Sequence, residues 1–307
     1  MRVWPGESGQ AAVLSVVWMV VVLGLAGLVI DVGSWFRAQR SLQAQADASA
    51  LAGAQDLPTD TSGAGGLAQT YATKNGFNLP ASGITISGDI VPNDSITVKV
   101  NDDSPTFFSK LFGLQTVPVR ATATARSDLV AQARWAAPIT VNILHPLLSG
   151  TVGSKQCPCF GTETTLPLDK RGAPGAFGLL DLDNNNGNGS STLAKWIESG
   201  FDGYLDVGNH SSNTGAKFDS NAIDNALTAR LGTVLLFPVY DTLLVQGTNA
   251  IYHIVAWVGF RLDSFQINGG NSGTITGAFT DITWQGVPVN SGSSQPDLGA
   301  RVITLTH

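Results

Sequence analysis

The chain has 307 residues, and its 17 Lys and Arg residues against 23 Asp and Glu residues give a formal net charge of −6 at pH 7. This acidic balance leaves no basic stripe to replace the counterions of a nucleic acid, so we expect no nucleic-acid partner. Charged residues make up only 13% of the chain, about half the usual share. Ser, Thr, Asn and Gly fill the surface instead, which is common on exported proteins.

Residues 11–30 form the most apolar segment of the chain. No charge occurs from residue 8 to residue 30, and 12 of the residues from 11 to 30 are Val, Leu or Ile. Such a helix crosses a bilayer core about 30 Å thick, and each of these side chains favours insertion by roughly 0.3–0.6 kcal/mol. The alternative is a buried core helix, but a helix apolar on every face has little core to enter at a chain terminus. The run is also longer than that of a cleaved signal peptide, so we expect a permanent membrane anchor.

The residues that follow the apolar run continue the same helix. Residues 35–56 are rich in Ala, Gln, Leu and Arg, and no turn cluster precedes them. We predict one helix from about residue 10 to about residue 56, roughly 70 Å long. Its outer half has a face of small side chains that suits packing either on the chain's own domain or on neighbouring helices. That face consists of Ala46, Ser49, Ala50 and Gly53, with Leu42 and Leu51 beside it.

Asp31 stands directly after the apolar run. Its carboxylate either marks the point where the helix meets water or serves as an assembly contact for a partner's cation or terminal amine. Trp35 and Phe36 are typical interface anchors, and Arg37 and Arg40 are expected to contact lipid headgroups.

Four stretches of this region resemble a known family. They are residues 8–13 (SGQAAV), 27–33 (GLVIDVG), 40–43 (RSLQ) and 46–54 (ADASALAGA). At this spacing they resemble the N-terminal segment of TadG-like proteins of the Flp (tight adherence) pilus-assembly system. The resemblance covers residues 8–54 and joins an apolar helix to an Asp-Val-Gly step and an Ala-rich segment.

The resemblance implies a pseudopilin-like protein that crosses the bacterial cell membrane once. It implies a cytoplasmic N-terminus, an extracytoplasmic bulk, and contacts with membrane lipid and other pilus-assembly proteins, and it allows a homo-oligomer through the N-terminal helix. A prepilin-type leader peptidase would cut between Gly9 and Gln10, but Leu14 stands where such enzymes favour Glu. The sequence is therefore compatible both with cleavage of the leader and with its retention.

Residues 57–130 predict a small pilin-like α+β module packed on the outer half of the long helix. The expected elements are a flexible turn at 59–66, helices at 67–76 and 104–113, and strands at 84–87, 95–100 and 117–126. Four apolar side chains of the second helix either join the module's core or dip into the membrane surface, and we expect core. They are Phe107, Phe108, Leu111 and Phe112.

Residues 131–307 predict a β-rich α+β domain with a mainly antiparallel sheet. We expect strands at 233–245, 250–265, 274–284 and 302–306, helices at 192–198 and 220–231, and hairpin turns at 246–249 and 268–271. The whole chain is thus predicted to be α+β. A cytoplasmic leader occupies residues 1–9, the membrane-spanning and projecting helix residues 10–56, and the two folded parts lie outside the membrane.

A loop rich in Asn and Gly suggests a calcium site. Asp181, Asp183 and Asn185 present side-chain oxygens at alternate positions, as a hard cation requires. The EF-hand pattern departs at two places, because Asn186 replaces the sixth-place Gly and Thr192 the twelfth-place Glu. The alternative is a loop of Asx turns without a metal.

The two cysteines, Cys157 and Cys159, are separated by one residue. They form a small-ring disulfide, remain free thiols, or provide half of a metal site, and a local role is the simplest interpretation. The sequence contains no nucleophile elbow, no zinc-protease motif and no phosphate-binding loop. His253 lies inside a strand-like run, which is typical of a structural histidine.

These patterns predict a protein that is not an enzyme and needs no cofactor other than the calcium considered above. Its expected function is that of a membrane-anchored component of Flp pilus assembly, acting through extracytoplasmic protein contacts. The alternative is an anchored surface domain that binds a cell-wall or host ligand.

Overall fold

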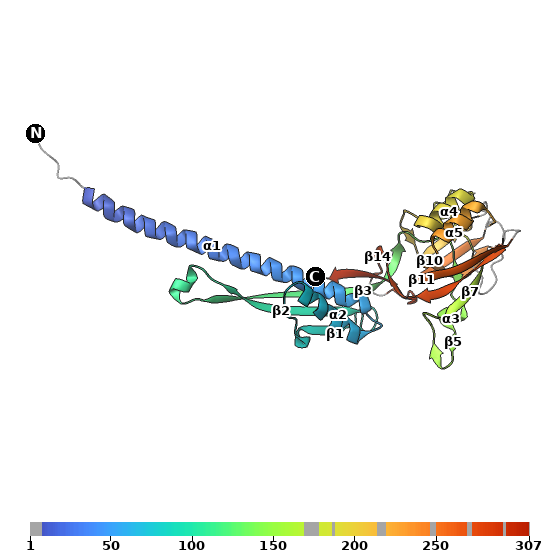
Figure 1. Cartoon of the computed structure of the whole chain (residues 1–307), viewed down its shortest axis with the longest axis horizontal. Helices are drawn as coiled ribbons and strands as arrows, with labels where there is room; N and C mark the ends of the chain where they lie inside the picture. The colour runs from blue at the N-terminus through green and yellow to red at the C-terminus, as the bar shows by residue number, and fades with distance from the viewer. Residues whose placement is uncertain are drawn as a thin grey trace, which may run out of the picture. The chain divides into compact units, whose positions relative to one another are not determined.

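The computed structural model describes residues 8–168, 178–185, 188–213, 219–245, 250–268, 272–290 and 293–306. The chain divides into two compact units: Met1–Arg126 with Leu305–His307, and Ser127–Thr304. The boundary falls within one long strand, β3 (Thr116–Ala133). As predicted, the fold is α+β, with a long apolar N-terminal helix followed by a β-rich region (Figure 1).

Helix α1 runs without interruption from Ser8 to Gly53, and the 3₁₀ turn η1 (Ala54–Asp56) follows it. At 1.5 Å per residue, α1 is about 70 Å long, which confirms the single helix expected from the sequence. Its most apolar window is only 6% buried, and the helix is long and apolar enough to cross a membrane. Within residues 11–30, all described, Gly27 is the only buried residue. Among the residues that the structure describes, this half of α1 is therefore not a core helix.

The outer half of α1 packs on its own unit. Leu42, Ala46 and Ala50 are buried. A Cβ atom on Gly53 would lie 2.6 Å from Cδ1 of Ile96 in strand β2 (Ser95–Pro105) and 2.8 Å from a carbonyl oxygen of helix α2 (Thr61–Lys74). Of the two alternatives for the small-residue face, packing on the chain's own domain is the one observed.

Helix α2 begins earlier than the sequence indicated, and the flexible turn predicted at 59–66 is wrong. Asp60 caps the helix by accepting a hydrogen bond of 2.8 Å from the N–H of Gly63. Ala64, Ala68 and Ala72 are fully buried along one face of α2. Packing of this face offsets the cost of about 1 kcal/mol that each glycine imposes on a helix.

A long hairpin replaces the second predicted helix of the first unit. Strand β1 (Ile84–Ser87) pairs with β2, and β2 pairs with β3 in antiparallel register from Ser95↔Arg126 to Pro105↔Thr116. The helix predicted at 104–113 is wrong, because Ser104 and Pro105 continue β2. Only the 3₁₀ turn η3 (Ser109–Phe112) is helical, and it ends at Gly113 with φ 87°.

The four apolar side chains near this turn are not core residues. Leu111 is 80% exposed and Phe112 is 90% exposed, and Phe107 and Phe108 are exposed as well. The core prediction is wrong because the two strands carry these residues beyond the last strand pair, to the end of the hairpin. The apolar spacing therefore marks a turn and not the inner face of a helix.

The second unit is built on a six-stranded sheet in the order β4-β10-β11-β12-β7, with β9 also paired to β11. Apart from the parallel β4–β10 pair, the strand pairs are antiparallel, as predicted. The strands are β4 (Val141–Asn142), β7 (Glu163–Leu168), β9 (Gly208–Ser211), β10 (Val234–Val245), β11 (Ile251–Asn268) and β12 (Ser272–Thr280). The predicted turn at 246–249 and residues 269–271 of the other turn lie outside the described residues.

Short strands complete the unit. The predicted strand 274–284 ends at Thr280, and Ile282–Thr283 (β13) pairs in parallel with β15 (Ala300–Thr306). Leu205–Asp206 (β8) and Gly286–Pro288 (β14) pair with the last residues of β3. A two-stranded ribbon, β5 (Thr151–Val152) and β6 (Lys155–Gln156), follows the short helix α3 (Pro146–Ser149).

Helices α4 (Ser190–Ser199) and α5 (Asn221–Ala229) confirm the two helices predicted in this unit. Ser220 caps α5, and both helices bury apolar side chains in the core. Aromatic rings fill the centre of that core, where Phe237 stacks on Phe260 at 5.1 Å and Phe279 meets Phe260 edge-on at 5.4 Å.

Candidate functional site

Asp31 is fully buried and accepts hydrogen bonds from four groups of its own chain. Its carboxylate oxygens accept the backbone N–H groups of Phe107 at 2.7 Å, Phe108 at 3.1 Å and Ser109 at 2.6 Å. The hydroxyl of Ser109 donates a further bond of 2.7 Å. The membrane-boundary carboxylate predicted from the sequence is therefore bound to the end of the β2–β3 hairpin, a partner that the sequence analysis did not identify.

We call residues 106–115 the hairpin tip, and its backbone donors are largely paired. Asp31 accepts the N–H groups of Phe107, Phe108 and the first η3 residue, Ser109, as a capping residue does at a helix start. The N–H groups of Leu111, Gly113 and Leu114 bond to carbonyls of the tip itself, at 3.0–3.2 Å. Thr106 closes the tip with an N–H bond of 3.0 Å to the carbonyl of Gln115.

Gly27 lies directly beneath the hairpin tip, inside the apolar run of α1. A Cβ atom on Gly27 would lie 2.6 Å from Cδ1 of Phe108, closer than side chains can approach. The ring of Phe108 therefore needs the bare backbone of a glycine at this point. Gly24 and Gly33, in contrast, have no atom within 4 Å of the corresponding position.

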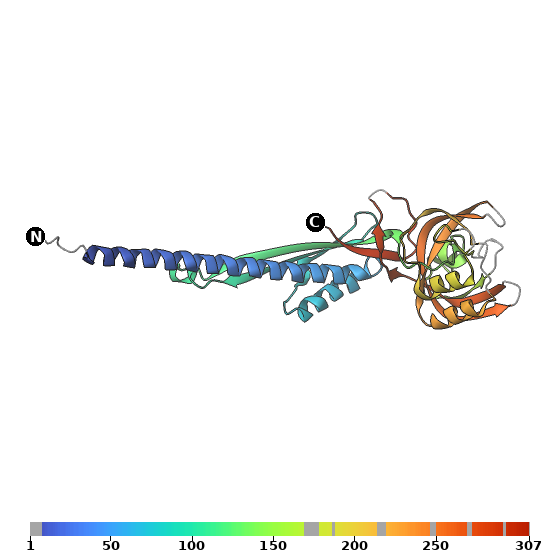
Figure 2. The ribbon, with the colours of Figure 1, turned by 90° about the horizontal axis from the view of Figure 1, so that it is seen from above.

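Two glutamines bind the hairpin to the middle of α1. The side-chain amides of Gln39 and Gln43, one turn apart, donate to the backbone carbonyls of Arg120 and Thr122 on β3. Together with the Asp31 contacts, these bonds hold the hairpin along the helix from residue 43 down to residue 27. Figures 1 and 2 both show the tip beside the middle of α1.

The remaining residues predicted at the membrane boundary lie on the next turns of α1. Trp35 is half-buried, while Phe36, Arg37 and Arg40 are exposed. Gly9 and Gln10 belong to the first turn of α1, and residues 1–7 of the predicted leader lie outside the described residues.

The candidate calcium loop brings its two carboxylates together. The side-chain amide of Asn188 donates to Oδ1 of Asp181 at 2.9 Å and to Oδ1 of Asp183 at 2.6 Å. Asp181 is buried, and its other oxygen has no hydrogen-bond partner among the described residues. Asn185 donates its backbone N–H to Asp183 at 3.1 Å, which is an Asx turn. The described residues contain no group of three or more His, Cys, Asp or Glu side chains that could hold a metal ion.

The cysteines and histidines of the second unit have structural contacts. Cys157 and Cys159 form a disulfide, and both are buried. Burial lowers the pKa of His145, which accepts the N–H of Leu147 at 3.2 Å and so caps α3. His253 contacts the carboxylate of Asp241 at 2.9 Å on the exposed surface of the sheet.

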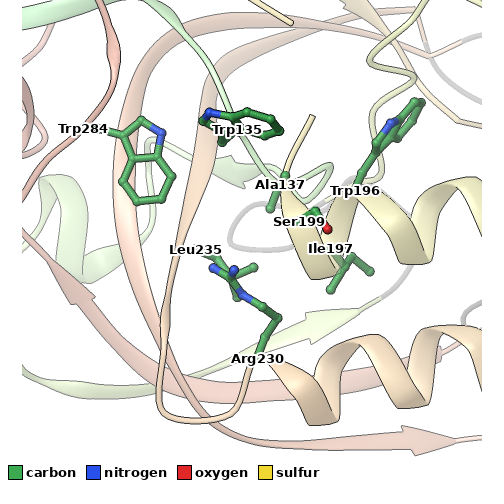
Figure 3. A pocket seen from close by; sticks show the side chains of 9 residues that line it. Trp135, Ala137, Trp196, Ile197, Ser199, Arg230, Leu235 and Trp284 are labelled. Carbon is green, nitrogen blue, oxygen red and sulfur yellow. The ribbon is translucent and has the colours of Figure 1, made fainter. Parts of the chain in front are cut away.

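A pocket of about 210 Å³ opens in the second unit, lined by three tryptophans and an arginine. The rings of Trp135, Trp196 and Trp284 lie along one side, and Arg230 lies opposite them (Figure 3). Trp135 has a φ of 62°, which is rare for a bulky residue. A Cβ atom on Gly200 would lie 2.6 Å from Cα of Trp135. Only a glycine at position 200 therefore leaves room for the strained backbone of Trp135.

Comparison with protein families identifies the N-terminal segment. Residues 9–56, which comprise almost all of α1 and the turn η1, match the family model described as "Putative Flp pilus-assembly TadE/G-like". No curated protein and no solved structure matches the chain at a significant level. The match confirms the resemblance found in the sequence and supports a role in pilus assembly. The similarity to this family covers 48 of the 307 residues and lies in the N-terminal helix and the turn after it.

Proposed function

We propose that this chain is a non-enzymatic, pseudopilin-like component of Flp pilus assembly, anchored in the bacterial cell membrane by residues 11–30. The observation that carries the proposal is the exposure of the apolar half of α1 within the segment that matches the family. Its large apolar side chains have no cover in the described chain, and a bilayer supplies that cover.

In this proposal the N-terminus is cytoplasmic, residues 11–30 cross the membrane, and the chain that follows them is on the extracytoplasmic side. The Cys157–Cys159 disulfide supports this orientation, because disulfides persist in oxidising compartments outside the cytosol. The two units then act through contacts with other pilus-assembly proteins. A homo-oligomer through α1 would have to use its exposed apolar half, because α2 and β2 cover the small-residue face.

Membrane extraction and protease treatment test the anchor and its orientation. We expect the full chain to stay with membranes in alkaline carbonate, and a Val20→Arg, Leu23→Arg variant to be released, since each arginine costs roughly 2.5–3.5 kcal/mol at a helix centre. Protease added to spheroplasts is expected to digest the part of the chain that follows residue 30. Digestion only after lysis would show that the orientation is wrong.

The assembly role and the leader need separate measurements. Deletion of the gene is expected to abolish Flp pili on the cell surface, and normal pili in the deletion strain would contradict the assembly role. N-terminal sequencing of the membrane-bound protein distinguishes a processed chain, starting at Gln10, from one that retains its leader.

The tryptophan pocket favours a second candidate function, the binding of a cell-wall or host ligand. A strained residue such as Trp135 persists where the fold or its function requires it. At about 210 Å³, the pocket is smaller than the roughly 300–1,000 Å³ typical of drug-sized ligands. It admits a group about as large as one sugar ring. Titration of the full chain with soluble cell-wall fragments, followed by tryptophan fluorescence, tests this candidate, and a loss of response in Trp135→Ala would support it.

A further inference from the structure

The hairpin tip carries a concentrated apolar surface that no described part of the chain covers. Each of its apolar side chains is at least one-third exposed, and the outermost two are almost fully exposed. They are Phe107, Phe108, Leu111, Phe112 and Leu114. Large apolar side chains grouped in this way on one turn mark an interaction surface.

The position of the tip along α1 indicates which environment surrounds this apolar surface. Phe108 packs on Gly27, four residues before Asp31 and three residues inside the end of the apolar run. Four helical residues span about 6 Å. Peripheral amphipathic segments enter the boundary between headgroups and acyl chains to a depth of about 5–10 Å. The tip therefore lies at the depth of the interface for any bilayer that covers residues 11–30.

Most backbone N–H groups of the hairpin tip have a hydrogen-bond partner within the protein, which an environment without water requires. An N–H group in hydrocarbon is costly unless it has a partner in the protein. Asp31 accepts the N–H groups of Phe107, Phe108 and Ser109, and carbonyls within the tip accept those of Leu111, Gly113 and Leu114. The exposed Lys110 is long enough to reach headgroup phosphates from this turn.

We propose that the hairpin tip inserts into the same membrane that α1 crosses, in the outer leaflet, as a second membrane contact of this chain. The occupant of its apolar surface is lipid. This inference rests on the proposed membrane anchor, because the apolar surfaces of the tip and of residues 11–30 are continuous at Phe108 and Gly27. The tip then fixes the rotation and tilt of α1, as interfacial anchors do.

A depth measurement on the full chain in lipid nanodiscs tests the proposal. A single cysteine at Phe112 is labelled with an environment-sensitive fluorophore, and the buried Cys157–Cys159 disulfide leaves no other reactive thiol in the described chain. Quenchers are attached to lipid acyl chains, either near the headgroup or near the terminal methyl group, or are dissolved in water. Val20→Cys in the anchor and Asn101→Cys, exposed higher on the same hairpin, are the matched controls.

The expected result is that lipid-attached quenchers reduce the signal at Phe112→Cys and at Val20→Cys, while the aqueous quencher acts on Asn101→Cys. We expect the aqueous quencher to be at least about tenfold less effective at position 112 than at position 101. Leu111→Cys should repeat the result. Both positions are exposed, so neither label disturbs the fold.

Three other outcomes overturn the proposal in distinguishable ways. Aqueous quenching at position 112 with lipid quenching at Val20→Cys would leave the anchor intact and place the tip in water. Protection of position 112 from both quenchers would show a protein cover, such as a second copy of the chain. Failure of lipid quenching at Val20→Cys would contradict both the proposed membrane anchor and the proposed membrane contact of the tip.

Discussion

The ring of Phe108, at the end of the β2–β3 hairpin, lies on Gly27 in the apolar half of α1. This contact joins two segments that are 81 residues apart in the sequence. It places an extended part of the first unit beside the stretch that we assign to the membrane. In the proposed membrane arrangement, the fold of the first unit therefore determines which residues of the chain meet the bilayer surface.

Replacing Gly27 by Ala should displace the hairpin tip. The added methyl group overlaps the ring of Phe108, and overpacking of this kind costs about 1–3 kcal/mol. Gly24→Ala is the matched control, since it gains the same helix propensity without any neighbour within 4 Å. Hydrogen exchange of residues 107–114 is expected to speed up in Gly27→Ala and not in Gly24→Ala. Equal rates in the two variants would contradict the contact.

Replacing Asp31 by Asn should loosen the same turn through the loss of an acceptor. The carboxylate accepts four donors, whereas an amide offers one oxygen and two donors of its own. We expect the amides of Phe107, Phe108 and Ser109 to exchange about tenfold faster or more. Asp102→Asn, exposed on the same hairpin, should leave these rates unchanged. Unchanged protection in Asp31→Asn would rule out the capping role.

The apolar run and the unbroken helix followed directly from the sequence, because both depend on local composition. Asp31 was located at the membrane boundary for the same reason. Its bonds to Phe107–Ser109 were not predictable, because they depend on where a hairpin from a distant part of the chain ends. Spacing alone could not distinguish a helix at 104–113 from a strand that continues through Pro105, so tertiary pairing decided the outcome.

Asp94 should make the stability of the first unit depend on pH. Burial raises the pKa of Asp94, but its hydrogen bonds outweigh this effect and hold the pKa below its ordinary value of 3.8. The donors are the side chain of Ser95 and the N–H groups of Asp89, Ile90 and Val91. Because the folded state has the lower pKa, the stabilisation is complete above pH 3.8 and is lost as the pH falls further.

The variant Asp94→Asn isolates this effect. We expect it to lower the free energy of unfolding by about 1–3 kcal/mol at pH 7 and by less at pH 3, as measured by urea unfolding of the full chain in detergent. Asp103→Asn, exposed on β2, is the control. A stability difference between wild type and Asp94→Asn that stays constant from pH 7 to pH 3 would refute the prediction.

The calcium hypothesis makes its own prediction for the second unit. Binding at a concentration 100 times the dissociation constant would stabilise the folded chain by about 2.7 kcal/mol. Thermal unfolding should then shift upward with calcium, less with magnesium, and not at all in Asp181→Asn. No shift at millimolar calcium would favour the Asx-turn loop closed by the Asn188 amide.

The disulfide predicts the thiol content of the native protein. Alkylation of the denatured, unreduced chain taken from membranes should give no adduct, and prior reduction should give two, at Cys157 and Cys159. Loss of a cross-link that closes so short a loop should cost about 1–2 kcal/mol. Two adducts without reduction would place these residues in a reducing compartment.

The second unit shows the same division between local and long-range information. The strand-like runs at 233–245 and 250–265 and the helical run at 220–231 were sufficient to predict β10, β11 and α5. The tryptophan pocket was not predictable, because Trp135, Trp196 and Trp284 come from three separate segments. The short strands β4, β8 and β14 exist only through their partners and carry no periodic pattern of their own.

Labelling of Asn101→Cys in spheroplasts tests the central claim most directly, because this residue is exposed and follows the anchor in the first unit. A membrane-impermeant maleimide should react with intact spheroplasts to the same extent as with lysed ones. Reaction only after lysis would place residue 101 in the cytoplasm and contradict the proposed orientation.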